Sequence, residues 1–184
     1  MIRLDQIPNL LTISRIIAAP IWILAFYYNF YLLCILIIIY TAATDFLDGW
    51  LARKIDNTSI IGESLDPIAD KIFLVTVLIS YVSDNRANFI LVSLIIIREI
   101  IVSSLREILS KYNKSSILKV TYLAKIKTCF QFFTILTIGF IPLFNSLAIE
   151  LQFYGKILLY LTTFITIFTG YKYVMNSIIE IKKF

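Results

Sequence analysis

The chain has 184 residues, of which 59% are hydrophobic, and its 17 lysines and arginines outnumber 12 aspartates and glutamates to give a net charge of +5. Soluble domains are about 45–50% apolar, so this composition excludes an ordinary soluble domain and predicts an integral membrane protein with one domain over residues 1–184. The absence of histidine excludes catalysis by an imidazole base and metal binding by imidazole.

Six apolar runs separated by turn-forming residues predict an all-α bundle of six transmembrane helices. In chain order, the runs cover residues 9–28, 31–52, 65–83, 88–108, 124–144 and 152–175. The first run is predicted to end at Tyr28-Asn29, and the third at Ser83-Asp84-Asn85.

Lysines and arginines are distributed unevenly between the two ends of these runs. One set of connections and termini holds most of them, whereas the opposite set holds Arg86 and almost nothing else. Cytoplasmic loops carry an excess of basic residues, so both termini are expected to be cytoplasmic. The basic connection at residues 109–124 is then on the same side and is expected to lie along the membrane interface.

The cysteines and aromatic residues agree with a membrane protein. Cys34 and Cys129 lie in separate apolar runs, so both are expected to be small buried hydrophobic residues rather than a disulfide or a metal-binding pair. The aromatic residues are embedded in runs of isoleucine and leucine, which argues against nucleic-acid binding despite the positive net charge.

Four aspartates are the most costly feature of this apolar chain. Asp45 and Asp48 lie near the end of the second run, and Asp66 and Asp70 lie near the start of the third. A carboxylate at the centre of a membrane helix costs about 2.5–3.5 kcal/mol, so a compensating partner is expected. Residues three or four positions apart share a helix face, so each pair presents its carboxylates together, and the two pairs are expected to converge.

An all-oxygen site of this kind suits Mg²⁺ or Mn²⁺. Two ions about 3.5–4 Å apart would use four carboxylates and suit phosphoryl chemistry, with Arg53 available for a phosphate. Pro67 suits the first turn of the third helix, with Ser64 or Asp66 near the cap, or else it marks a kink. The alternative is that the four aspartates are solvated charges at the membrane surface.

The spacing of these residues resembles a family signature. The pattern of the CDP-alcohol phosphatidyltransferase family is D-x2-D-G-x2-A-R-x8-G-x3-D-x3-D, and this chain meets every position. The matching residues are Asp45, Asp48, Gly49, Ala52, Arg53, Gly62, Asp66 and Asp70. The family fold of six transmembrane helices agrees with the number predicted from hydropathy.

The resemblance implies roles for these positions. Asp45 and Asp66 would bridge two metal ions, Asp48 would complete one metal site, and Asp70 would contact the second ion and act as the general base. A homodimer is also implied. The residues implied in binding the CDP group are Gly49, Arg53, Ser59, Pro8, Asn9, Leu10 and Leu11.

Basic residues of the fourth and fifth runs point to an anionic acceptor. Guanidinium groups bind phosphate through two hydrogen bonds, so Arg98, Arg106, Lys125 and Lys127 are the predicted acceptor-phosphate site. The alternatives are a structural ion pair, either Glu99 with Arg106 or Arg98 with a carboxylate, and lysines that extend from a helix end toward water.

Three motifs resemble a bacterial branch of the family that uses glycerol 3-phosphate as acceptor. They are the segment from Ile7 to Arg15, the motif R-E-I-x2-S-x-L-R-E from Arg98, and A-K-x-K-T at 124–128, where Ala124 replaces the usual glycine. The resemblance implies that the phosphatidyl group of CDP-diacylglycerol passes to sn-glycerol 3-phosphate, giving phosphatidylglycerophosphate and CMP, at the cytoplasmic face of the bacterial inner membrane. The alternatives are a sibling transferase that uses inositol, inositol phosphate or serine and, more remotely, a metal-ion or solute transporter.

Overall fold

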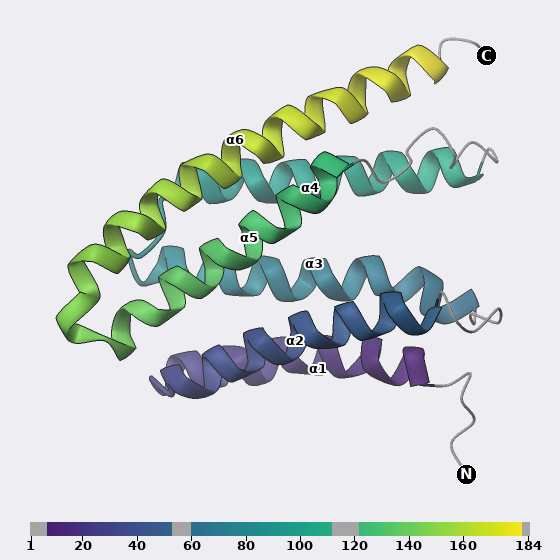
Figure 1. Cartoon of the computed structure of the whole chain (residues 1–184). Helices are drawn as coiled ribbons and strands as arrows, with labels where there is room; N and C mark the ends of the chain where they lie inside the picture. Colours follow the sequence, from purple (N-terminus) through teal and green to yellow (C-terminus); the bar gives the residue numbers. More distant parts are fainter. Residues whose placement is uncertain (1–6, 53–59, 112–121, 182–184) are drawn as a thin grey trace.

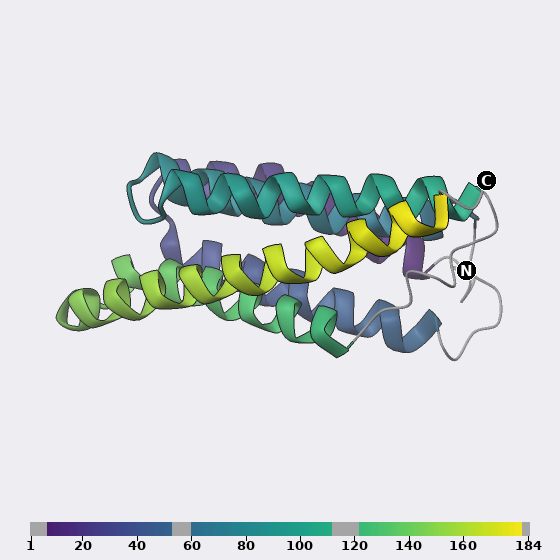
Figure 2. The ribbon, with the colours of Figure 1, turned by 90° about the horizontal axis from the view of Figure 1, so that it is seen from above.

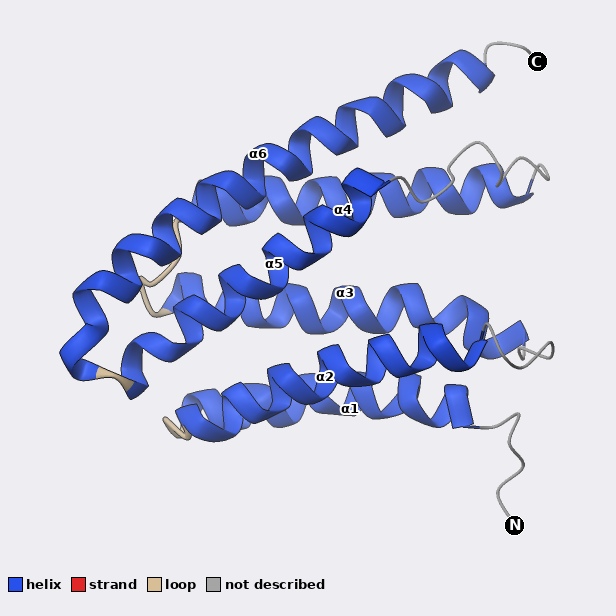
Figure 3. Ribbon diagram, in the orientation of Figure 1, coloured by secondary structure: helices blue, strands red, loops and turns tan. Residues whose placement is uncertain are grey.

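The fold was analysed in a computed structural model that describes residues 7–52, 60–111 and 122–181; next to the gaps, including 48–52, 60–67 and Asp70, it describes the backbone alone. Six α-helices and two short 3₁₀ turns make up the described part of the chain, which contains no strand (Figure 3). The elements are α1 (Ile7–Tyr27), α2 (Tyr31–Ala52), α3 (Ile60–Ser83), α4 (Phe89–Lys111), α5 (Tyr122–Phe140), η3 (Ile141–Leu143), η4 (Asn145–Leu147) and α6 (Ala148–Ile181).

The helices run up and down in a bundle of two layers. Helices α1, α3 and α4 form one layer, and α2, α5 and α6 form the other (Figure 2). The end of α2, the start of α3, the end of α4 and the start of α5 lie at one end of the bundle, together with the start of α1 and the end of α6 (Figure 1). The α1–α2 and α3–α4 turns lie at the opposite end. We call these the proximal end and the distal end.

The α1–α2 and α3–α4 turns are each formed at an asparagine in the left-handed backbone region. Asn29 has φ 60° and Asn85 has φ 55°, a conformation that asparagine adopts more readily than most residues. The Phe30 amide donates to the Ala25 carbonyl at 2.8 Å, which closes the end of α1. The predicted helix ends at Tyr28-Asn29 and Ser83-Asp84-Asn85 are therefore confirmed to within one residue.

The main hydrophobic core draws most of its buried residues from α1, α2, α3 and α5. The Trp22 side chain is fully buried, stacks on Phe26 with ring centroids 5.0 Å apart, and donates to the Cys34 carbonyl at 3.1 Å. The Tyr81 hydroxyl donates to the Ile135 carbonyl at 2.9 Å and thereby joins α3 to α5. These contacts satisfy the polar atoms of large buried aromatic residues and fix the rotation of the helices about their axes.

Several helices have the length and composition of membrane spans. The segments Leu10–Tyr27, Lys125–Leu143 and Asn145–Ile179 are long and apolar enough to cross a membrane, and the shorter segments Tyr31–Leu47 and Lys71–Ser83 are also apolar. Helix α4 begins with an apolar run but carries charged residues from Arg98 onward, among them Glu99 and Arg106. The predicted all-α class is confirmed, with six helices in the described part of the chain.

Two expectations need correction, and a third is not tested. Helix α3 begins at Ile60 rather than near residue 65, so Pro67 lies inside the helix and not in its first turn, and neither Ser64 nor Asp66 caps it. Cys129 is exposed because it lies on the outward face of α5, whereas Cys34 is buried as predicted. Most of the 109–124 connection lies outside the described residues, so its interfacial position stays a prediction.

Candidate functional site

Helix α1 supplies a buried arginine to the first aspartate of the signature. The Arg15 side chain is only 2% exposed, and its Nη1 donates to Asp45 Oδ1 on α2 at 3.2 Å. The Asp45 side chain is 63% exposed, so most of the carboxylate faces away from the packed core. A buried guanidinium has few other orientations, and it therefore holds this carboxylate in one place.

The α1–α2 contact beside this ion pair is also polar. The Tyr40 hydroxyl on α2 donates to Ser14 Oγ at 2.9 Å, and Ser14 Oγ donates to the Leu11 carbonyl at 2.7 Å. These bonds link the α2 segment preceding Asp45 to the α1 segment that contains the predicted CDP contacts Leu10 and Leu11. Leu10 is exposed and Leu11 is half-buried.

The backbone positions of the other three aspartates follow from the helix bounds. Asp48 lies in α2, and Asp66 and Asp70 lie in α3; α2 ends and α3 begins at the proximal end (Figure 1). Their carboxylates and the side chains of the predicted CDP contacts Pro8 and Asn9 lie outside what the structure describes. Gly49 is described by its helical backbone alone, and Arg53 and Ser59 lie outside the described residues altogether. The metal set and the CDP contacts therefore stay predictions.

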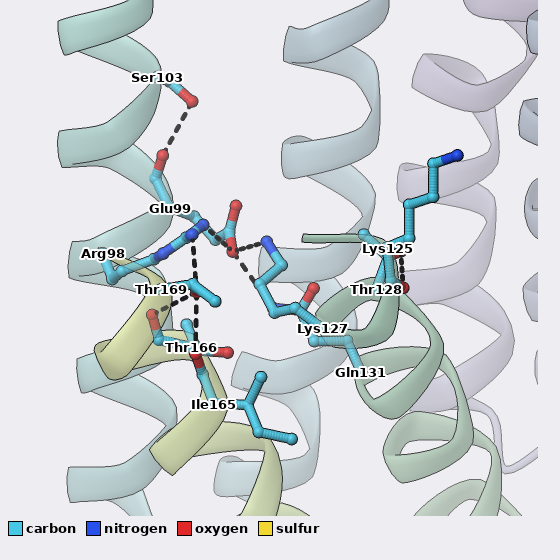
Figure 4. Close-up of polar contacts among 10 residues, drawn as sticks. All are labelled: Arg98, Glu99, Ser103, Lys125, Lys127, Thr128, Gln131, Ile165, Thr166 and Thr169. Atoms are coloured by element: carbon cyan, nitrogen blue, oxygen red, sulfur yellow. Dashed lines mark hydrogen bonds and ion pairs between the residues drawn. The ribbon is translucent and has the colours of Figure 1, made fainter. Parts of the chain in front are cut away.

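A buried polar cluster lies between α4, α5 and α6 and is centred on one carboxylate oxygen. Glu99 Oε1 accepts hydrogen bonds from Arg98 Nη1 at 3.1 Å and from Gln131 Nε2 at 3.3 Å, and it forms an ion pair with Lys127 Nζ (Figure 4). Arg98 Nη2 donates to Thr169 Oγ1 of α6 at 3.0 Å. All five side chains belong to residues that are buried. We call these five residues the Glu99 cluster.

The Glu99 cluster has more positive than negative charge. Two cations, Arg98 and Lys127, share the single carboxylate of Glu99. Buried charges are costly unless they are paired and hydrogen-bonded, yet Arg98 Nε has no hydrogen-bond partner among the described residues. The nearby Thr166 Oγ1 of α6 is also without one in the described chain. The cluster therefore has an excess of positive charge and an unused N–H donor at Arg98 Nε among the described residues.

Glycine at position 170 gives Arg98 the space that it occupies. A Cβ atom at this position would lie 2.6 Å from Arg98 Cγ, closer than Cβ atoms approach other atoms in proteins, and a tight 3.1 Å from Arg98 Nε. The Arg98 guanidinium also lies over the Tyr173 ring, with 5.9 Å from Cζ to the ring centroid. Helix α6 thus shapes the position of an arginine that belongs to α4.

The structure brings together two of the four predicted acceptor ligands. Arg98 and Lys127 meet at Glu99, whereas Arg106 and Lys125 are exposed, and Lys125 points away from Glu99 (Figure 4). Of the two structural ion pairs considered as alternatives, Arg98 with a carboxylate is present. Gln131 and Thr169 were not among the residues predicted from the sequence. Gln131 had a detectable signal, because it lies one turn after Lys127 on the same helix face.

Helix α3, which carries Asp70, contacts both α4 and α5, and these two helices supply four of the five residues of the Glu99 cluster.

Comparison with known proteins places the chain in a family. The model of the CDP-alcohol phosphatidyltransferase family matches residues 5–168, which is most of the chain. The chain belongs to the CDP-alcohol phosphatidyltransferase family. It is thus a transferase, and the family resemblance noted from the signature is confirmed.

Several bacterial members of this family are similar to the chain over most of its length. One from Rickettsia felis is 41% identical over 93% of the chain and 95% of its own length, and one from Yersinia enterocolitica is 34% identical over 91% and 92%. A relative from Blochmanniella floridana is 41% identical over 72% of the chain and 73% of its own length. All three are named CDP-diacylglycerol--glycerol-3-phosphate 3-phosphatidyltransferase.

Proposed function

We propose that the protein transfers the phosphatidyl group of CDP-diacylglycerol to the free primary hydroxyl of sn-glycerol 3-phosphate, releasing CMP and forming phosphatidylglycerophosphate. The observation that carries this proposal is the similarity to relatives that are named for this reaction: two of them are 34–41% identical to the chain over more than nine-tenths of its length. The acceptor oxygen forms a bond to the phosphorus of the phosphatidyl group, and the bond from that phosphorus to the CMP oxygen breaks. The hydroxyl proton passes to Asp70.

The signature aspartates are proposed to hold two divalent metal ions, Mg²⁺ or Mn²⁺. Asp45 fits this role, because its carboxylate is a hard oxygen donor, is largely exposed, and has only one oxygen engaged by Arg15. Asp48, Asp66 and Asp70 would supply the remaining carboxylates. The ions would neutralise charge on the pyrophosphate of the donor. The chain itself orients Asp45 through Arg15.

The Glu99 cluster is proposed to bind the phosphate of the acceptor. Arg98 and Lys127 leave a net positive charge after pairing with Glu99, and Arg98 Nε is an unused donor among the described residues. Glycerol 3-phosphate carries a doubly charged phosphate group that such a site favours. Arg106 and Lys125 are exposed and are proposed to attract the acceptor toward the cluster rather than to enclose it.

The setting of the reaction is part of the proposal. All six helices are proposed to cross the bacterial inner membrane, with both termini and the proximal end on the cytoplasmic side, and two chains are proposed to form a homodimer. The predicted CDP contacts in α1, α2 and the connection after α2 would then face the cytoplasm. The exposed apolar side chains on every helix support a membrane setting.

The test is an assay of purified protein with CDP-diacylglycerol, Mg²⁺ and glycerol 3-phosphate, in which CMP and phosphatidylglycerophosphate are measured. We expect both products in equal amounts, and no CMP after chelation of the metal. The variant Asp70→Asn should lose at least a hundredfold in rate, because the general base is removed.

Parallel reactions with inositol, inositol phosphate and serine distinguish the sibling activities. Equal or faster CMP release with any of these acceptors would overturn the choice of glycerol 3-phosphate. Transport of a metal ion or solute into liposomes, without CMP release, would instead indicate a transporter.

A further inference from the structure

A pocket at the distal end of the bundle plays no part in the proposed reaction. It lies between the α3–α4 turn and α6 and has a volume of about 470 Å³, which is within the range of about 300–1,000 Å³ for ligand pockets. The turn supplies Asn85, Arg86, Asn88 and Phe89 to its wall, and α6 supplies Lys156 and Tyr160. The proximal end, where α2 ends after Asp45, lies at the other end of the helices (Figure 1). We call this cavity the distal pocket.

The wall of the distal pocket is positively charged. It contains Arg86 and Lys156, and no aspartate or glutamate is among the described residues that line it. Lys156 is exposed and has no ion-pair partner in the described part of the chain. A pocket with two cations and no lining carboxylate favours an anionic ligand.

Arg86 is held in a fixed orientation by contacts within its own turn and with two helices, α1 and α2. Its Nη2 pairs with Asp84 in the same turn, and its Cζ lies 4.9 Å from the Tyr31 ring centroid and 5.5 Å from the Phe26 ring centroid. Asp84 is itself partly exposed, so solvent screens this pairing. Nη1 of Arg86 is buried without a hydrogen-bond partner among the described residues. The guanidinium is thus preorganised and not fully satisfied.

The position of these two cations is unusual for this chain. Most lysines and arginines lie toward the proximal end, and the distal turns and the adjoining helix starts carry only Arg86 and Lys156 in the described chain. A single basic residue here would simply reach into the interface between lipid and water. Two that come from segments 70 residues apart and line one cavity indicate a binding site.

The surroundings of the pocket are apolar and aromatic. Phe89 is 68% exposed and Tyr160 is 61% exposed, and the neighbouring Ile90 and Ile157 are exposed as well. Lys156 and Tyr160 also lie within Asn145–Ile179, a segment that can cross a membrane. A ligand seated here would meet cations at its anionic group and apolar side chains next to it. These are the two parts of a phospholipid.

We propose that the distal pocket binds the phosphate group of an anionic phospholipid from the membrane leaflet at that end of the bundle. Arg86 and Lys156 would bind the phosphodiester oxygens, and Phe89 and Tyr160 would contact the acyl chains. A zwitterionic lipid would bind less well, because its ammonium group would enter a pocket that is already positive. The proposal does not depend on which reaction the proximal end catalyses.

The experiment measures lipid binding to the purified full-length protein by native mass spectrometry from detergent micelles. Phosphatidylglycerol and phosphatidylcholine with identical acyl chains are titrated against the wild type and the variant Lys156→Gln. We expect the wild type to prefer phosphatidylglycerol, and Lys156→Gln to weaken its binding about fivefold, since one basic residue near a membrane contributes about 1 kcal/mol. Because Lys156 is exposed, the thermal unfolding midpoint without lipid should not change.

The matched control is Lys172→Gln, which removes an exposed lysine from the proximal part of the same helix, where it lies over the Phe168 ring. This variant should bind phosphatidylglycerol as the wild type does.

Equal weakening of phosphatidylglycerol binding in Lys156→Gln and Lys172→Gln would overturn the proposal, and so would equal binding of the two lipids by the wild type. Displacement of the lipid by millimolar inorganic phosphate would also overturn it, because the pocket would then recognise a free anion. The catalytic rate of Lys156→Gln at saturating substrate should match that of the wild type. A negative lipid-binding result would therefore leave the proposed transferase function standing, and loss of that function would not by itself affect the lipid-binding result.

Discussion

At the scale of single residues, two polar contacts decide how the charged side chains of this bundle are arranged. Arg15 orients Asp45 across the α1–α2 interface, and Glu99 gathers Arg98, Lys127 and Gln131 onto one oxygen. Each contact joins residues that are buried on at least one side, where the effective dielectric constant is low. Single substitutions at these positions should therefore change stability or substrate and metal binding more than substitutions of exposed charged residues do.

Replacement of Arg15 by glutamine should weaken metal binding rather than abolish activity. Without the guanidinium, Asp45 keeps its charge but loses the group that orients it, and such supporting partners typically contribute about 10–100-fold to metal affinity. We expect the Mn²⁺ concentration for half-maximal CMP release to rise by about that factor, with recovery of the rate at high Mn²⁺. Ser14→Ala, which alters the neighbouring residue of α1, is the control. An unchanged Mn²⁺ requirement in Arg15→Gln would show that the pair has only a structural role.

Replacement of Glu99 by glutamine should destabilise the bundle and impair acceptor binding together. The substitution leaves Arg98 and Lys127 close to each other and without a counter-charge, and breaking a buried ion pair in this way costs about 3–5 kcal/mol. We expect a lower thermal unfolding midpoint in detergent and a higher KM for glycerol 3-phosphate, with the KM for CDP-diacylglycerol little changed. Glu107→Gln, at an exposed position of the same helix, provides the comparison. If the two variants behave alike, Glu99 does not organise the cluster.

At the scale of the elements, helix α6 supports a site formed mainly by α4 and α5. It contributes Thr169 as an acceptor for Arg98, and Gly170 and Tyr173 as the surface on which Arg98 lies. Thr162 of the same helix hydrogen-bonds Thr134 of α5 at 2.7 Å. Polar side chains inside an apolar bundle are costly unless they are paired, so this row of threonines sets how α6 is rotated against its neighbours.

Substitution of Gly170 by alanine should displace Arg98. The added Cβ would lie 2.6 Å from Arg98 Cγ, whereas at Gly155 of the same helix an added Cβ would meet nothing closer than Ile138 Cγ1 at 3.1 Å. Overpacking of this kind costs about 1–3 kcal/mol. We expect Gly170→Ala to raise the KM for glycerol 3-phosphate and to lower the unfolding midpoint, and Gly155→Ala to affect only the midpoint. An unaltered KM for glycerol 3-phosphate in Gly170→Ala would contradict a role of Arg98 in binding the acceptor.

At the scale of the whole molecule, the bundle has two chemically different ends. The proximal end carries the signature aspartates and most of the basic residues, and the distal end consists of tight turns, aromatic side chains and the distal pocket. An enzyme that joins a membrane-embedded donor to a water-soluble acceptor needs one end open to the aqueous compartment that holds the acceptor. This polarity of the bundle is the physical basis for the proposed orientation.

The orientation can be measured by cysteine labelling in intact bacterial cells. After replacement of Cys34 and Cys129, single cysteines are introduced as Ser83→Cys at the distal end and Asn176→Cys near the proximal end of α6, both at exposed positions. A membrane-impermeant maleimide should label Ser83→Cys and not Asn176→Cys, because the positive-inside rule places the proximal end in the cytoplasm. The reverse labelling pattern would refute the proposed topology, and labelling of both after lysis confirms that each cysteine is reactive.

Much of the architecture could be predicted from the sequence, because it depends on local properties. Apolar runs of sufficient length and the asparagines at Asn29 and Asn85 located the helices and two turns to within a few residues. The start of α3 was misplaced, because Pro67 is tolerated inside a helix whose neighbours compensate for the missing backbone donor. The exposure of Cys129 was missed because apolar residues on a lipid-facing helix surface have the same composition as buried ones.

The sequence by itself determined the fold class, the family signature and the chemistry that the four aspartates suggest, since helical period and residue spacing are properties of adjacent residues. Only the tertiary structure decided which charges meet. Arg15 and Asp45 are 30 positions apart, Glu99 and Gln131 are 32 apart, and Arg98 and Thr169 are 71 apart. Their contacts depend on how each helix is rotated about its axis, which is set by packing around Trp22, Tyr81 and Gly170. Helix packing likewise brings Arg86 and Lys156 to the wall of one pocket, although they are far apart in the sequence.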